Sequence, residues 1–150
     1  MRILFYLLTL LSFDIYAQDA TSNVWLLNID SAKVEAIKTN KPIMIVFSGS
    51  DWCKPCIKLK HEILESETFL AFAKDSLVLV AADFPRLKTN RQSDAQVKHN
   101  ENLASKYNQS GSFPHVVFIN TEEKILGTLG YKPIPPIEYN KLIKSIILNQ

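Results

Sequence analysis

Three short runs of consecutive apolar residues interrupt an otherwise mixed pattern of polar and apolar positions. Such runs are typical of strands that are buried on both faces of a sheet. Two of them are Ile43–Phe47 and Leu77–Ala82, and the third lies within the predicted strand His115–Ile119. A further stretch, Lys124–Leu129, follows the third run across a polar turn and predicts its hairpin partner.

Apolar residues recur at helical spacing between and around these strands. The pattern predicts a short helix at the start, a long helix that begins at Cys53 and restarts or kinks near Ser66, and two later helices. The expected ranges are 30–40, 53–75, 94–108 and 135–148. The order helix-strand-helix-strand-helix-strand-strand-helix predicts an α/β fold with a central mixed sheet of about four to five strands, flanked by helices on both faces. Strand-helix-strand units imply parallel pairing, and the final hairpin adds an antiparallel edge.

The first seventeen residues have the pattern of a secretory signal peptide rather than of a folded element. Arg2 precedes the apolar run Ile3–Leu11, and Ala17 is a small residue suited to the position before a cleavage. An uncleaved membrane anchor is the alternative, but a span needs about 20 apolar residues and Asp14 interrupts this one. We expect cleavage between Ala17 and Gln18, export to the periplasm or the medium, and one domain over residues 18–150.

Composition narrows the function classes only slightly. Hydrophobic residues make up 47% and charged residues 21% of the 150 residues, which is an ordinary globular composition. The formal net charge of +2 is too small to indicate nucleic acid or an anionic membrane as a partner.

The only two cysteines, Cys53 and Cys56, lie in the stretch "SDWCKPC" and allow three chemistries. A disulfide between them would close a very short loop, which stabilises a fold by roughly 2 kcal/mol and pins nothing distant. A zinc site would need about two more ligands, and His61, His99 and His115 lack finger-like spacing. A copper site that uses both thiolates remains open.

A redox role suits the position of the pair, because a strand delivers the chain to a turn and Cys53 stands where the next helix begins. Unpaired N–H groups at a helix start favour a thiolate, which is the species that attacks a disulfide. Lys54 adds a positive charge, and Pro55 fits the first turn. Cys56, which lies about one turn into the helix, is expected to be the more buried thiol. We favour the redox interpretation over the other two.

The stretch "SDWCKPC", followed some sixty residues later by "SFPHVVF", resembles the thioredoxin superfamily. The approach "KPIMIVFSGSDWC" is similar to exported bacterial thioredoxin-like proteins, including the C-terminal domain of thiol:disulfide interchange proteins. The resemblance implies a thioredoxin fold, with Cys53 as an exposed nucleophile and Cys56 as the resolving thiol. It also implies that Pro114 is a cis-proline opposite the cysteines.

Three residues are candidates for binding a substrate. Pro114 lacks an N–H and stops the third strand at its start, which leaves the backbone of Phe113 available to pair with an extended segment. Trp52 offers a flat apolar surface beside the cysteines. A strand-opening proline and a half-buried tryptophan are the structural alternatives.

Other residues could tune the pair or bind a partner. Many relatives carry a buried acid on the strand before the motif, but Ile43–Phe47 has none, so the proton acceptor for Cys56 stays open. Lys54 and His115 are candidates for lowering the pKa of Cys53, although a lone histidine is more often a strand-end residue with ordinary partners. The connection that carries Arg86, Lys88 and Arg91 could bind an acidic partner. The alternative, which we favour on sequence alone, is that it is an ordinary solvated surface loop.

The sequence therefore predicts an exported thiol-disulfide oxidoreductase that reduces protein disulfides through Cys53 and Cys56. It needs no cofactor, and a membrane electron donor would regenerate the dithiol. The alternatives are a disulfide oxidase or isomerase, and a copper-binding or adaptor module without turnover. The specific substrate and the oligomeric state are left open.

Overall fold

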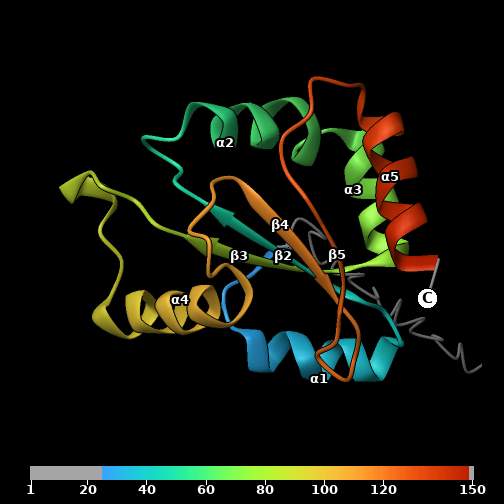
Figure 1. Ribbon diagram of the computed structural model, residues 1–150, viewed down its shortest axis with the longest axis horizontal. Coiled ribbons are helices and arrows are strands. Elements are labelled where there is room, and N and C mark those ends of the chain that lie inside the picture. Colours follow the sequence, from blue (N-terminus) through green and yellow to red (C-terminus); the bar gives the residue numbers. More distant parts are fainter. Residues whose placement is uncertain (1–24, 149–150) are drawn as a thin grey trace, which may run out of the picture.

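The computed structural model describes residues 25–148 and is built on one mixed five-stranded sheet (Figure 1). The strands lie in the order β1-β3-β2-β4-β5, with β1, β3 and β2 parallel, β4 antiparallel to β2, and β5 antiparallel to β4. Their bounds are β1 Trp25–Leu26, β2 Ile43–Ser48, β3 Val78–Asp83, β4 His115–Ile119 and β5 Ile125–Leu129. The expected α/β architecture with a mixed central sheet is confirmed.

Helices cover both faces of the sheet, as expected, and divide the interior into two cores (Figure 1). One face carries α1 and α4, and the other carries α2, the π-helical segment η1, α3 and α5. Their bounds are α1 Ile29–Thr39, α2 Lys54–Lys58, η1 Leu59–Leu64, α3 Glu67–Ser76, α4 Asp94–Tyr107 and α5 Pro136–Leu148, and a 3-10 turn, η2, covers Lys88–Asn90. Within residues 25–148, none of these helices is long and apolar enough to cross a membrane.

The central strand β2 is buried on both sides, which explains its continuous apolar run. Successive side chains of a strand point to opposite faces. Ile43, Ile45 and Phe47 therefore enter the core under α1 and α4, and Met44 and Val46 enter the core under α3 and α5. This central position places the end of β2, and the cysteines that follow it, in the middle of one edge of the sheet.

The helix that begins after the cysteines restarts where the sequence predicts it. Ser66 is the N-cap of α3 and accepts the N–H of Phe69 at 3.2 Å. Before it, the N–H of Glu65 bonds the carbonyl of Lys60 at 2.9 Å, the five-residue spacing of a π-helix. The sequence pattern did not predict this π-helical segment.

The direction of β4 differs from the expectation that strand-helix-strand order implies parallel pairing. His115 at the start of β4 lies opposite Phe47, near the end of β2, so β4 runs antiparallel to β2. The chain between Asp83 and His115 thus returns to the same edge of the sheet instead of crossing its length. The start of β4 is thereby brought next to the turn that carries the cysteines.

Two other differences concern the N-terminal part of the chain. The short edge strand β1 was not expected, and it pairs Trp25 with Leu79 and Leu26 with Val80 of β3. The predicted signal peptide, residues 1–17, and its cleavage site lie outside the described residues.

Candidate active site

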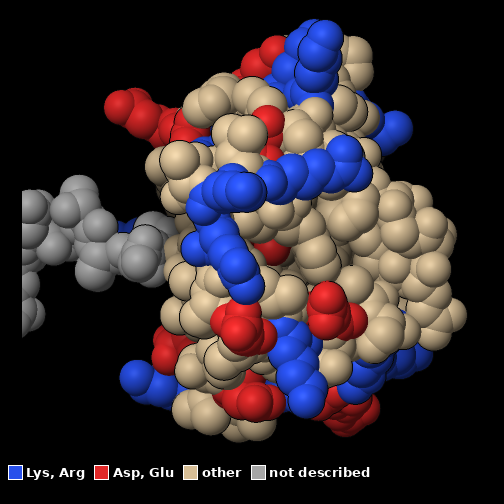
Figure 2. Space-filling view, turned by 90° about the vertical axis from the view of Figure 1, so that its left-hand side faces the viewer, with Lys and Arg blue, Asp and Glu red and all other residues tan. Residues whose placement is uncertain are grey.

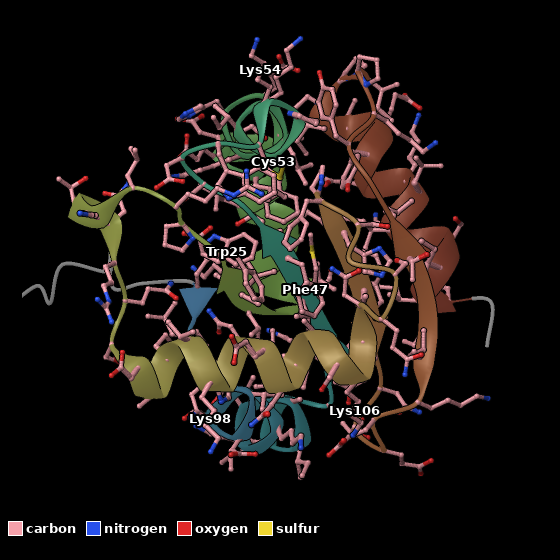
Figure 3. The ribbon with its side chains drawn as sticks, turned by 60° about the vertical axis from the view of Figure 1, so that its left-hand side comes forward. Trp25, Phe47, Cys53, Lys54, Lys98 and Lys106 are labelled. Atoms are coloured by element: carbon pink, nitrogen blue, oxygen red, sulfur yellow. A yellow bond between two sulfur atoms is a disulfide. The ribbon has the colours of Figure 1, made fainter. Side chains whose placement is uncertain are left out.

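Cys53 and Cys56 are joined by a disulfide with an S–S distance of 2.07 Å at the start of α2 (Figure 3). The turn after β2 is closed by the carbonyl of Gly49, which accepts the N–H of Cys53 at 2.9 Å. Cys53 is the N-cap of α2, and its Sγ accepts the N–H of Cys56 at 3.3 Å. The expected placement at a strand-to-helix junction is confirmed.

The burial of the pair differs from what the resemblance implies. Cys53 is 5% exposed and Cys56 is 3% exposed, so in this oxidised form Cys53 is not the exposed residue that was expected. Cys53 is buried because its Sγ is bonded to the Sγ of Cys56 and points toward the backbone N–H of Cys56. Cys56 is the more buried of the two only by a small margin.

Trp52 lies in an aromatic cluster that joins three segments of the chain. Its ring packs edge-on against Phe113, with centroids 5.5 Å apart, and Phe113 packs edge-on against Phe84 at 5.4 Å. The indole Nε1 donates to the carbonyl of Phe84 at 2.7 Å. The guanidinium of Arg86 lies 3.8 Å from the centroid of the Trp52 ring. The turn before Cys53, the end of β3 and the segment before β4 therefore form one surface.

Sequence reasoning assigned no role to Phe84, although a signal for it exists. Phe84 directly follows β3, and Trp52 lies a few residues beyond β2. Parallel neighbouring strands end at the same edge of a sheet, so residues just after them are close in space. This rule would have placed Phe84 beside the cysteine turn.

Asp51 fixes the connection after β3 to the cysteine turn. Its Oδ1 accepts the N–H of Arg86 at 2.9 Å, and its Oδ2 accepts the N–H of Leu87 at 2.9 Å and the Nδ2 of Asn90 at 3.0 Å. The hydrogen bond from Arg86, with help from those of Leu87 and Asn90, holds the pKa of Asp51 below its ordinary value. These contacts show that Asp51 orients the connection after β3.

Replacing Asp51 by asparagine should loosen this connection, because an amide has only one acceptor oxygen for three donors. We expect amide hydrogen exchange at Arg86 and Leu87 to accelerate roughly tenfold or more, while the core strands are unaffected. In the wild type, a carboxylate with a lowered pKa bonds fully at neutral pH and loses this contribution as the pH falls below the carboxyl range of about 4. The variant should lack this acid-dependent step.

Exchange measured by mass spectrometry or NMR on both proteins checks this prediction. The matched control is Asp75→Asn, because Asp75 is exposed and lies near the end of α3, away from the connection. Unchanged exchange at Arg86 and Leu87 in Asp51→Asn would contradict the tether.

Asp83, at the end of β3, bonds the turn between β2 and the cysteines. Its Oδ1 accepts the hydroxyl of Ser48 at 3.1 Å and the N–H of Ser50 at 2.9 Å, and its Oδ2 accepts the hydroxyl of Ser50 at 2.6 Å. These contacts give Asp83 a role in holding the turn. None of them reaches a sulfur atom.

Phe113 and Pro114 lie beside the cysteine turn, before the first paired residue of β4. The peptide bond between them is cis, as the resemblance implies. Phe113 is held by both Trp52 and Phe84. The strand pairing of β4 with β2 begins only at His115, so the backbone of Phe113 lies beyond the ladder.

His115 does not have the placement that tuning of Cys53 requires. Strand alternation puts its side chain on the face of Val117, in the core under α1 and α4, whereas α2 lies over the other face. The ring lies 6.1 Å from that of Phe47. Burial lowers the pKa of His115, and a hydrogen bond to the backbone of Tyr107 opposes this. His115 is therefore a packed residue at the start of a strand with ordinary partners, which was the alternative interpretation of the sequence.

The structure also shows where Lys54 lies and bears on the metal-site alternative. Lys54 is exposed at the start of α2 and points away from the body of the molecule (Figure 3). In the part of the chain that the structure describes, no group of three or more His, Cys, Asp or Glu side chains could hold a metal ion. His99 instead accepts the N–H of Ile29 at 3.2 Å and so joins α4 to the start of α1.

The sheet order, the two helical layers and a Cys-x-x-Cys pair at the start of α2 beside a cis-proline define a thioredoxin-fold protein. Residues 24–121 match the family model described as thioredoxin-like. The chain belongs to this thioredoxin-like family.

Individual relatives agree with this assignment. The chain is 40% identical over 108 residues to the disulfide bond reductase DsbH of Chlamydia pneumoniae, covering 72% of this chain and 63% of that protein. It is 30% identical over 113 residues to the thioredoxin-related protein DsbJ of the same organism, of which it spans only 32%. A solved structure described as DsbH oxidoreductase superposes with a TM-score of 0.77 at 35% identity, covering 84% of this chain and 85% of that one. The C-terminal domain of DsbD from Neisseria meningitidis, at 13% identity, a TM-score of 0.54 and coverage of 78% and 90%, shares the fold.

Proposed function

We propose that this protein is an exported thiol-disulfide oxidoreductase that reduces disulfides in other proteins. The observation that carries the proposal is the Cys53–Cys56 disulfide at the start of α2, bordered by the aromatic surface of Trp52 and Phe113. This disulfide is the oxidised form that a dithiol reductase reaches after one turnover. The relative named a disulfide bond reductase supports the direction.

The cycle follows from thiol-disulfide exchange. The thiolate of Cys53 attacks one sulfur of the substrate disulfide, which breaks that bond, forms a mixed disulfide and releases one substrate thiolate. The thiolate of Cys56 then attacks the Sγ of Cys53 and releases the second. Two electrons pass to the substrate, its two thiolates take up two protons, and the protein is left with the Cys53–Cys56 bond. A membrane electron donor would reduce that bond again.

Trp52, Phe113 and Pro114 are proposed to hold the substrate. Phe113 lies outside the β-ladder, so its backbone can pair with an extended segment in the manner of strand addition. Trp52 offers an aromatic surface next to Cys53, and its orientation is fixed by the hydrogen bond to Phe84. Lys54, exposed and positive, would favour the thiolate form of Cys53 when the pair is reduced.

Export is proposed from the pattern of the first seventeen residues, with cleavage near Ala17 and Gln18. An exported location exposes the protein to disulfide-containing substrates. It also makes an electron donor in the membrane the natural source of reducing equivalents.

The reduction potential of the Cys53–Cys56 pair tests the proposed direction. Thioredoxin-like reductants lie near about −270 mV, and strong oxidants near about −120 mV. We expect a value nearer the first, together with measurable reduction of insulin by the purified protein in the presence of dithiothreitol. A potential near the oxidising end would support the oxidase or isomerase alternative instead. No reduction of insulin, combined with stoichiometric copper binding, would support the carrier alternative.

A further inference from the structure

The connection between β3 and α4 is held in one shape next to the cysteine turn. Asp51 bonds it at three points, and the N–H of Phe84 bonds the carbonyl of Ser48 at 2.8 Å. From α4, the Nδ2 of Asn100 donates to the carbonyl of Asp83 at the start of the connection at 2.9 Å, and to the Oε1 of Gln92 near its end at 3.2 Å. These tethers hold the loop in a preformed shape, and a preformed loop loses little entropy when it binds a partner.

This tethered connection presents cations around an apolar hollow. A cavity of about 290 Å³ is lined by the apolar residues Phe84, Pro85, Leu87 and Val97 and by Arg86, Lys88 and Arg91, and Asp83, Gln92 and Asn100 complete the lining. Leu87 is 56% exposed, so its apolar side chain is open to a partner. Figure 2 faces this side of the molecule and shows a band of Lys and Arg side chains across its upper half.

Most of these cations have no carboxylate partner. Arg91 pairs with Asp94 at 3.3 Å, and both side chains are strongly exposed. Among residues 25–148, Arg86 and Lys88 make no ion pair, and neither do Lys54 and Lys58 on the adjoining α2. The carboxylate of Asp51, which accepts the backbone N–H of Arg86, is already occupied by backbone and amide donors. The positive charge of this face is therefore available to an outside partner.

We propose that this face selects disulfides whose flanking segment is acidic. The inference rests on the proposed function and names its substrate class. Arg86 stacks on Trp52, the residue that precedes Cys53, so the cationic loop continues directly from the redox pair. An extended peptide advances about 3.3 Å per residue, so acidic residues within a few positions of the cystine would reach the loop. An apolar residue among them would contact Leu87.

Reduction of two synthetic cystine peptides tests this proposal. The peptides are identical except that the cystine is flanked by three glutamates in one and three lysines in the other. Pre-reduced protein is mixed with each peptide under single-turnover conditions. Each rate is divided by the rate at which dithiothreitol alone reduces the same peptide, which removes differences in the intrinsic reactivity of the two disulfides. We expect the acidic peptide to react about tenfold faster at low salt, and the preference to shrink as salt screens the charges.

Two charge reversals locate the effect. Lys88→Glu should lower the preference about threefold, while Lys38→Glu, which makes the same charge change in the last turn of α1, at the other end of β2 from the cysteines, should leave it nearly unchanged. Rates with the neutral disulfide of 2-hydroxyethanethiol should be the same in all three proteins.

Equal rates for the two peptides, or equal effects of the two reversals, would overturn the charge selection while leaving the reductase function intact. Failure to reduce either peptide, or the neutral disulfide, would instead contradict the proposed function. Binding to vesicles that contain phosphatidylserine, without any preference between the peptides, would show that this face contacts membranes and would also overturn the proposal.

Discussion

Replacing Cys53 by serine is expected to lower the rate of insulin reduction by about 10³-fold or more. The thiolate of Cys53 is the proposed nucleophile, and a serine hydroxyl is not ionised at neutral pH and cannot form a mixed disulfide. The catalytic residue is lost outright, so no residual pathway through Cys56 should reach the wild-type rate. The turbidity of reduced insulin, measured with dithiothreitol as the electron source, gives the comparison.

Cys56→Ser should behave differently, because it keeps the attacking thiol and lacks the resolving one. The mixed disulfide should then accumulate, visible as a protein adduct that survives non-reducing electrophoresis and disappears with reductant. Because either variant removes the disulfide, each is compared with reduced wild type for thermal stability. Adducts that form on Cys53→Ser and not on Cys56→Ser would reverse the assigned roles, and equal negligible reduction by wild type and Cys53→Ser would contradict the enzyme.

The elements that the sequence predicted well are those with a strong local signal. The run Ile43–Phe47 is apolar throughout because β2 is buried on both faces, and Ser66 begins α3 because its hydroxyl accepts a backbone N–H group. The direction of β4 has no such local signal, since it depends on which edge of the sheet the chain returns to. The two-residue β1 is too short to show any periodicity.

In the candidate site, too, the sequence predicts features that depend on neighbouring residues better than features that depend on residues far apart along the chain. The placement of Cys53 and Cys56 could be predicted because a strand, a turn and a helix succeed one another directly along the chain. The cluster around Trp52 has no such signal along the chain, because Phe84 and Phe113 come from other segments, and only the parallel pairing of β2 with β3 points to Phe84. The burial of Cys53 could not be predicted either, since it follows from the geometry of the oxidised pair.

Gly49→Ala is expected to destabilise the protein by about 1–3 kcal/mol and to impair disulfide reduction. A Cβ at position 49 would lie 2.2 Å from Cε2 of Trp52 and 2.5 Å from its Nε1, which is closer than atoms can approach. The ring would have to leave its place, and the hydrogen bond from Nε1 to Phe84 and the contact with Phe113 would be lost. Denaturant unfolding gives the change in stability, and insulin reduction gives the change in activity. Gly130→Ala is the matched control, because its nearest neighbour, the carbonyl of Pro114, lies at an ordinary 3.7 Å.

A double-mutant cycle with Trp52→Ala separates this steric conflict from other effects of the substitution. Once the indole is gone, an alanine at position 49 meets no ring, so Gly49→Ala should cost little stability in the Trp52→Ala background. The two changes should therefore couple by nearly the whole cost of the single substitution. The same cost in both backgrounds would show that the turn itself, rather than the contact with Trp52, excludes a side chain at this position. The strong coupling that we expect would mean that Gly49 is needed to seat Trp52 against the redox pair.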